Sequence, residues 1–184
     1  MLIPLIAVLV AGVVIAVGFL VGALQVGGPL GIQPKEKVAT TILKPTQVTA
    51  FDPLGDGQES NDLVPLATDG NPQTFWETEN YRQLDLGGTK PGVGLLFALG
   101  KPVTVTGFRL ITPFPGYHFQ IRVGGNPTGL ENKPGPAFTA QGHMHGDITP
   151  LKGRFVLLWI TDVVPTNSGN RATVAEFKVL GHRG

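Results

Sequence analysis

The distribution of charge divides this chain into two unlike parts. Residues 1–34 carry no charged side chain and are mostly Leu, Ile, Val, Ala and Gly, and the first charge is Lys35. A membrane-spanning helix needs about 20 consecutive apolar residues, and residues 2–24 meet that length. The sequence therefore predicts one transmembrane α-helix over residues 1–27, ahead of a separate domain.

A cleaved signal peptide is the alternative interpretation of this apolar run. Signal peptides have a basic start and an apolar region of about 7–15 residues before a small-x-small cleavage site. This run is longer, no Lys or Arg precedes it, and its only cleavage-like site is at Val21, Gly22 and Ala23. We therefore expect a retained anchor in the cell membrane. The missing basic start is also compatible with the chain being the C-terminal piece of a longer protein.

The rest of the composition excludes several kinds of site. The chain has no cysteine, which excludes disulfides, Fe–S clusters and thiolate zinc. Its formal net charge is +1 without a basic cluster, which argues against nucleic acid as a partner. Lys35, Lys37 and Lys44 follow the helix, but Glu36 offsets one of them. Because long domains translocate despite so weak a bias, charge alone leaves the membrane orientation open.

We expect residues 28–46 to form a juxtamembrane linker, with room for a short strand at residues 38–43. The pattern of residues 47–184 predicts one all-β domain. Short apolar segments alternate with Gly, Pro, Asn and Asp, and no amphipathic helix is evident. Residues 155–160 are apolar at every position, as in a central strand that is covered on both faces. Strands are predicted at residues 48–51, 74–76, 94–99, 103–111, 117–123, 138–140, 154–161 and 173–180.

Two of these segments carry further detail. Tyr117, Phe119, Ile121 and Val123 alternate with polar residues and should share one face of a strand. In residues 103–111 the alternation slips at Gly107, where a β-bulge would accommodate the extra residue. Many short strands without helices between them indicate a sandwich or jelly roll.

Several motifs, in order along the chain, resemble discoidin domains, also called factor V/VIII type C or galactose-binding-like domains. Residues 67–76 are similar to the early loop Ala-x-Asp-Gly-Asp-x-x-Thr-x-Trp of that family, residues 95–100 to its next strand end, and residues 174–181 to its closing strand. Residues 51–59 and 81–95 further resemble discoidin-like domains that are appended to membrane helices in actinobacterial-type envelope proteins, including kinase-like and lipid-flippase-like ones. The resemblance covers residues 48–181 and implies a jelly-roll β-sandwich.

The resemblance also implies a structural Ca²⁺ site in the early loop. Asp69, Asn71, Thr74 and Glu176 would supply oxygen ligands, which Ca²⁺ prefers. The family usually has Asp where this chain has Asn71, and the lost charge should weaken the site. The alternative is an Asx-turn, in which Asp69 bonds its own backbone and no metal binds.

Two other clusters are compatible with metal binding but have simpler interpretations. Asp52, Asp56, Glu59 and Asp62 form an acidic group, which we expect to be a solvated loop because its spacing matches no EF-hand. His143 and His145, near Asp147, would face the same way on a strand and suggest a zinc or copper ligand pair. Gly142 and Gly146 flank them and favour a loop instead.

The sequence contains no catalytic constellation. Neither Ser60 nor Ser168 lies in a Gly-x-Ser-x-Gly motif, and no Cys nucleophile or phosphate loop is present. Glycan-binding modules stack sugar rings on exposed aromatic side chains and add a few polar contacts. Residues in the expected end loops that offer this chemistry are Tyr81, Arg82, Phe114, Tyr117, Asn167 and Arg171.

We therefore expect a membrane-anchored, non-catalytic, extracytoplasmic module that recognises a cell-envelope glycan or glycolipid. The alternative is a protein-interaction scaffold that serves another membrane protein in a larger kinase-like or flippase-like system. An unrecognised hydrolase is a third, weaker hypothesis. A scaffold should present a flat apolar patch, and a hydrolase needs two titratable groups that face each other in a pocket.

Overall fold

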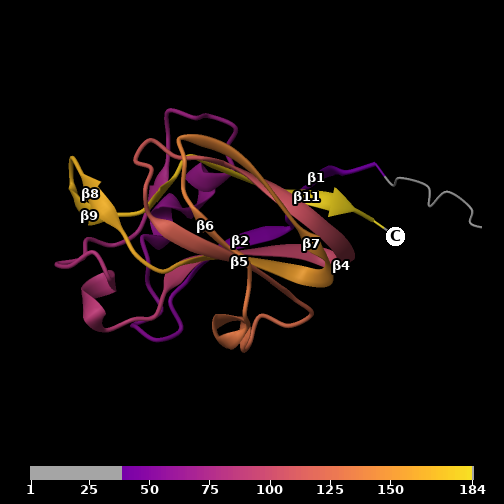
Figure 1. Ribbon diagram of the computed structural model, residues 1–184, viewed down its shortest axis with the longest axis horizontal. Helices are drawn as coiled ribbons and strands as arrows, with labels where there is room; N and C mark the ends of the chain where they lie inside the picture. The colour runs from indigo at the N-terminus through magenta and orange to yellow at the C-terminus, as the bar shows by residue number, and fades with distance from the viewer. Residues whose placement is uncertain (1–38, 184) are drawn as a thin grey trace, which may run out of the picture. The chain divides into compact units, whose positions relative to one another are not determined.

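Alternating apolar residues build an all-β sandwich in the computed structural model, which describes residues 39–183 (Figure 1). The predicted transmembrane helix at residues 1–27 lies outside the described residues. Within residues 39–183, no helix is long and apolar enough to cross a membrane. The helices that are described are short 3₁₀ turns: η1 (Asn61–Ala67), η2 (Leu86–Gly88) and η3 (Leu130–Asn132).

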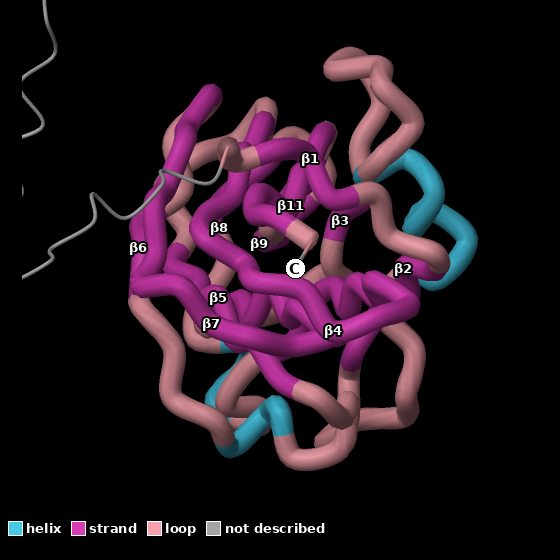
Figure 2. Tube along the Cα trace, turned by 90° about the vertical axis from the view of Figure 1, so that its right-hand side faces the viewer, coloured by secondary structure: helices cyan, strands magenta, loops and turns pink. Residues whose placement is uncertain are grey.

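Seven strands pair in one sheet that folds over on itself (Figure 2). Its order is β1-β11-β4-β7-β5-β6, and β2 pairs with β4 off this path. The strands are β1 (Thr41–Leu43), β2 (Gln47–Phe51), β4 (Val93–Ile111), β5 (His118–Gly124), β6 (Ala137–Thr139), β7 (His143–Ile160) and β11 (Glu176–His182). Two small ladders join β3 (Trp76–Glu77) to β10 (Thr173–Val174) and β8 (Val164–Thr166) to β9 (Gly169–Arg171).

Two long strands, β4 and β7, connect the two layers of the sandwich. The first part of β4 pairs with β2, its second part pairs with β11, and β7 follows it along both parts. The register shifts between Ala98 and Val103 and again between Val105 and Gly107. The bulge predicted at Gly107 is therefore confirmed, and a Cβ there would lie 2.5 Å from the carbonyl oxygen of Gly146.

The buried faces follow the predicted alternation. Phe119 of β5 meets Phe108 of β4 edge-on at 5.5 Å, and Phe108 stacks on Phe177 of β11 at 5.7 Å. Residues 155–160 are covered on both faces, as predicted. Val156, Leu158 and Ile160 belong to the main core, while Leu157 and Trp159 form a second small cluster with Leu130.

Three sequence predictions need correction. Residues 94–99 and 103–111 form one continuous strand, because the bulges let β4 bend without breaking its pairing. Residues 143–153, expected to be largely loop, are the first part of β7. Residues 41–43, assigned to the linker with room for a short strand, form edge strand β1 on β11 and bury Leu43. The sandwich therefore begins before residue 47.

A buried charge cluster ties two loops together beside β3. The ammonium of Lys90 donates a hydrogen bond of 2.9 Å to Asp52 and lies 3.7 Å from Glu59. The hydroxyl of Tyr81 donates to Glu59 at 2.9 Å. Asp52 and Glu59 are both buried, so the interpretation of this acidic group as a wholly solvated loop is wrong for these two. Asp56 and Asp62 are exposed.

Candidate functional site

A groove of about 540 Å³ opens among the loops at one end of the sandwich. It lies by the β8–β9 hairpin, which Figure 1 shows at the end opposite the C-terminus. The groove combines apolar residues with amide, carboxylate and hydroxyl groups. It is lined by Leu63, Pro72, Gln73, Phe75, Glu77, Pro113, Phe114, Asn167 and Ser168.

Two half-buried aromatic rings form the apolar part of this groove. Phe75 and Phe114 meet edge-to-face, with ring centroids 6.4 Å apart and planes at 76°. Phe75 precedes the buried Trp76, so strand alternation turns its side chain the opposite way. Phe114 lies between Pro113 and Pro115, whose fixed φ angles restrict the loop. The pair is therefore held in place before any ligand arrives.

Buried hydrogen bonds support the Phe114 loop from below. The hydroxyls of Thr112 and Thr173 are 2.7 Å apart, and the Tyr117 hydroxyl donates to the Thr173 carbonyl at 2.8 Å. Tyr117 is fully buried, and burial raises the pKa of its hydroxyl. The expectation that a sugar would stack on Tyr117 is wrong, because both faces of its ring lie in the core.

The polar side of the groove is organised around Glu77. Its carboxylate lies 3.4 Å from the guanidinium of Arg171 and accepts a 3.4 Å hydrogen bond from the Ser168 hydroxyl. Arg171 also donates to the Thr78 carbonyl at 2.6 Å. The predicted ligand contact Arg171 is therefore committed to the protein, where it holds Glu77 in position. Asn167 is exposed at the rim.

The Tyr81 and Arg82 prediction divides between the core and the surface. Tyr81 is 9% exposed, and burial together with Glu59 raises the pKa of its hydroxyl. Its hydroxyl belongs to the buried charge cluster, where it is bound to Glu59. Arg82 is exposed, and Tyr81 and Arg82 both line a depression of about 430 Å³, apart from the groove.

Of the six predicted ligand residues, Phe114 and Asn167 therefore line the groove. Sequence reasoning missed Gln73, Phe75, Glu77 and Ser168. The signal for Phe75 was its position next to Trp76 in the strand predicted at residues 74–76, because neighbouring side chains of a strand face opposite ways. No sequence signal identified Glu77, because its partner Arg171 is far along the chain.

The predicted calcium ligands surround one exposed turn, which has the hydrogen bonds of the Asx-turn alternative. Asp69 accepts 2.8 Å and 2.6 Å hydrogen bonds from the Asn71 N–H and the Thr74 hydroxyl. The Thr74 and Asn71 contacts lower the pKa of the Asp69 carboxyl. Glu176 accepts a bond from the Gly70 N–H, and the Asn71 side-chain oxygen accepts one from the Gln73 N–H at 3.1 Å.

Asp69, Thr74 and Glu176 thus bring oxygens to the same turn, as a hard cation requires. Within residues 39–183, however, no three His, Cys, Asp or Glu side chains converge as a metal site would. A bound cation would have to compete for these carboxylate oxygens with the N–H groups that already donate hydrogen bonds to them.

Calcium should raise the melting temperature if this turn holds the ion. Binding to the folded state alone adds RT ln(1 + [L]/Kd), about 2.7 kcal/mol at a hundredfold excess over Kd. Melts of the wild type and of Glu176→Gln, with calcium and with chelator, measure this. The shift should disappear in Glu176→Gln and persist in a Glu131→Gln control. If calcium leaves the melting temperature of the wild type unchanged, the turn is held by its hydrogen bonds alone.

No protein-family model matches the chain. Solved structures do match it. A truncated AlyQ with CBM32 and alginate lyase domains superposes with a TM-score of 0.58 at 20% identity, over 79% of this chain and 34% of that one. The CBM32 of AlyQ in complex with 4,5-unsaturated mannuronic acid gives 0.54 at 17%, over 76% and 97%. Chitosan-binding module 1 of a chitosanase/glucanase from Paenibacillus sp. IK-5 gives 0.52 at 19%, over 78% and 100%.

These similarities establish the fold. The structural neighbours are CBM32 carbohydrate-binding modules, which are galactose-binding-like, or discoidin-like, β-sandwich domains. The resemblance predicted from the motifs at residues 67–76, 95–100 and 174–181 is therefore confirmed for the fold. The chain spans about a third of the two-domain AlyQ fragment but nearly all of the two isolated modules.

Proposed function

We propose that this domain is a non-catalytic carbohydrate-binding module and that its loop-end groove holds the sugar. The observation that carries the proposal is the fixed Phe75–Phe114 pair inside a groove with a polar rim. Sugars offer apolar C–H faces to aromatic rings and hydroxyls to polar groups. The Glu77 carboxylate and the Asn167 amide provide acceptors and donors for those hydroxyls.

The structural neighbours support this class of function. One was solved with 4,5-unsaturated mannuronic acid and another is named as a chitosan-binding module. These two saccharides differ in charge, so the fold is compatible with more than one kind of ligand. We propose an envelope glycan or glycolipid as the ligand here, in keeping with the membrane anchor predicted from the sequence.

A glycan array that is probed with the full chain in detergent tests the proposal. A carbohydrate-binding module should retain a restricted set of related glycans, and soluble forms of those glycans should compete. The Asn167→Ala variant should retain less of the same set, because it removes an exposed rim amide without touching the core. No retention on an array that includes neutral, amino and acidic glycans would count against the proposal.

We also propose that residues 1–27 anchor the domain to the cell membrane, with the domain outside the cytoplasm. The uncharged, mostly apolar run of residues 1–34 supports this. The full chain should stay with the membrane fraction after an alkaline wash, while residues 35–184 should be released as a folded monomer. Release of the full chain by the wash, or aggregation of residues 35–184, would contradict the anchor.

The scaffold hypothesis has less support from the described residues. Their exposed large apolar side chains are Ile42, Leu54 and Leu84. These residues come from three separate segments of the chain rather than from one strand face or one loop. A protein-docking patch would be expected to concentrate such residues.

A further inference from the structure

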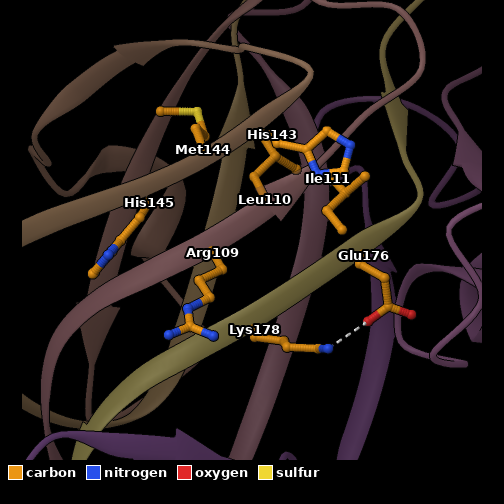
Figure 3. Close-up of a pocket in the computed structure, with 8 residues that line it drawn as sticks. All are labelled: Arg109, Leu110, Ile111, His143, Met144, His145, Glu176 and Lys178. Carbon is orange, nitrogen blue, oxygen red and sulfur yellow. Dashed lines mark ion pairs between the residues drawn. The ribbon is translucent and has the colours of Figure 1, made fainter.

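The sheet surface formed by β11, the second part of β4 and the first part of β7 carries a depression of about 340 Å³ with a different chemistry. β11, β4 and β7 lie side by side there, and Figure 3 shows Arg109 of β4 between Lys178 and His145. No residue lines both this depression and the loop-end groove. Arg109 is four residues from Pro113 at the groove's rim, which is about 13 Å of extended strand.

The strand register sets these basic side chains in one row. Lys178 of β11 is paired with Arg109, and Arg109 is paired with His145 of β7. Adjacent strands are about 4.8 Å apart, so the row crosses three strands over about 10 Å. In the next row, Ile111 lies between Glu176 and His143. The predicted alternation of His143 and His145 on one strand face is therefore observed, with Asp147 beside His145.

The row has one positive charge without a partner. The Lys178 ammonium lies 3.5 Å from Glu176, and the His145 ring lies 3.3 Å from Asp147. Among residues 39–183, Arg109 has no ion pair or side-chain hydrogen bond, and its side chain is exposed. A guanidinium is a planar fork of donors that matches an oxyanion by two parallel hydrogen bonds.

We propose that this depression is a second binding site, with Arg109 holding a carboxylate group of an acidic saccharide. One uncompensated positive charge suits a group with a single negative charge. A phosphomonoester carries about −1.5 to −2 and would bring its second charge next to Glu176. An anionic membrane surface is read by clusters of about 4–8 Lys or Arg, whereas this depression contains only Arg109 and Lys178.

Titration of the full chain with oligogalacturonate tests the proposal. The wild type should bind, the affinity should fall as salt is raised, and the carboxyl methyl ester of the same oligosaccharide should not bind. Arg109→Gln should weaken binding by about tenfold or more, since it removes the charge-assisted hydrogen bonds to the carboxylate. Arg154→Gln is the matched control, because it removes an exposed arginine elsewhere on β7, and it should bind as the wild type does.

Two further arms separate the alternatives. Phe114→Ala alters the loop-end groove and should leave oligogalacturonate binding intact, so loss of binding in this variant would assign the carboxylate to the groove and overturn the second site. The wild type and Arg109→Gln should differ less than twofold in their binding to vesicles of phosphatidylglycerol in phosphatidylcholine. Selective vesicle binding through Arg109, equal binding of the methyl ester, or no oligogalacturonate binding would each overturn the proposal.

Discussion

Replacing Lys90 by Met should lower the free energy of unfolding by about 3 kcal/mol at neutral pH. Lys90 is the cation between the buried carboxylates of Asp52 and Glu59. Removing one partner of a buried pair leaves uncompensated charge and costs about 3–5 kcal/mol. We take the lower end because the Lys90 side chain remains 14% exposed. One oxygen of Asp52 already lacks a hydrogen-bond partner within the described residues.

The pH dependence separates the loss of charge from the loss of packing. Burial raises the pKa of Glu59, against the opposing effects of the Glu79 N–H, Tyr81 and Lys90. Burial opposes the charge on Lys90, but Asp52 and Glu59 outweigh it and raise the pKa of Lys90. Protonation of Glu59 therefore stabilises the folded state. This contribution is complete at pH values below the pKa of Glu in the unfolded chain, near 4.3, and it is lost as pH rises through the higher pKa of Glu59 in the folded protein.

Removing Lys90 raises the pKa of Glu59 further, so the penalty of Lys90→Met should shrink between pH 7 and pH 4. Urea unfolding at both pH values measures the difference. Lys101→Met is the control, because Lys101 is exposed at the bend of β4. This control should change the unfolding free energy by less than about 0.5 kcal/mol. An equal penalty for Lys90→Met at both pH values would attribute its effect to packing and not to charge.

Truncating Phe114 to Ala should weaken glycan binding by more than about tenfold. Central aromatic residues of a binding site typically cost about 2 kcal/mol or more when truncated, and 1.4 kcal/mol is tenfold. Phe75→Ala should have a similar effect, because the two rings pack on each other. Calorimetric titration with a glycan retained on the array measures both variants well below their melting temperatures.

Two controls keep this second prediction interpretable. Leu84→Ala removes an exposed apolar side chain of the 81–86 loop, outside the groove, and should bind as the wild type does. Asn167→Ala should weaken binding with an unchanged melting temperature, since its side chain makes no hydrogen bond to the described residues. Unchanged affinity in Phe114→Ala, Phe75→Ala and Asn167→Ala together would remove the groove as the sugar site.

The sequence predicted the fold where hydrophobic alternation and burial coincide. Residues 155–160 and the alternating face of β5 were assigned correctly because the side-chain period of a strand is two. The bulge at Gly107 was visible as a slip in that period. Residues 143–153 were missed because Gly142, Gly146 and exposed histidines resemble a loop. Their strand structure comes from pairing with β4, which a local pattern does not contain.

The site was harder to predict because it depends on which loop residues turn inward. Tyr81 and Tyr117 were expected to offer aromatic rings to a ligand because they lie in the expected end loops. Both hydroxyls instead find buried partners, Glu59 and the Thr173 carbonyl, far away in the sequence. Arg171 was expected to bind a ligand but pairs with Glu77. Such long-range pairings determine whether a loop side chain is free to contact a ligand or is committed to the protein interior. They follow from the tertiary fold.

A crystal structure of the chain with its best array glycan is the most direct test of the central claim. The account predicts a sugar ring in the loop-end groove, in contact with Phe114 and Phe75, with its hydroxyls within hydrogen-bond distance of Glu77 or Asn167. A sugar ring bound by the Arg82 depression, with the groove empty, would contradict it.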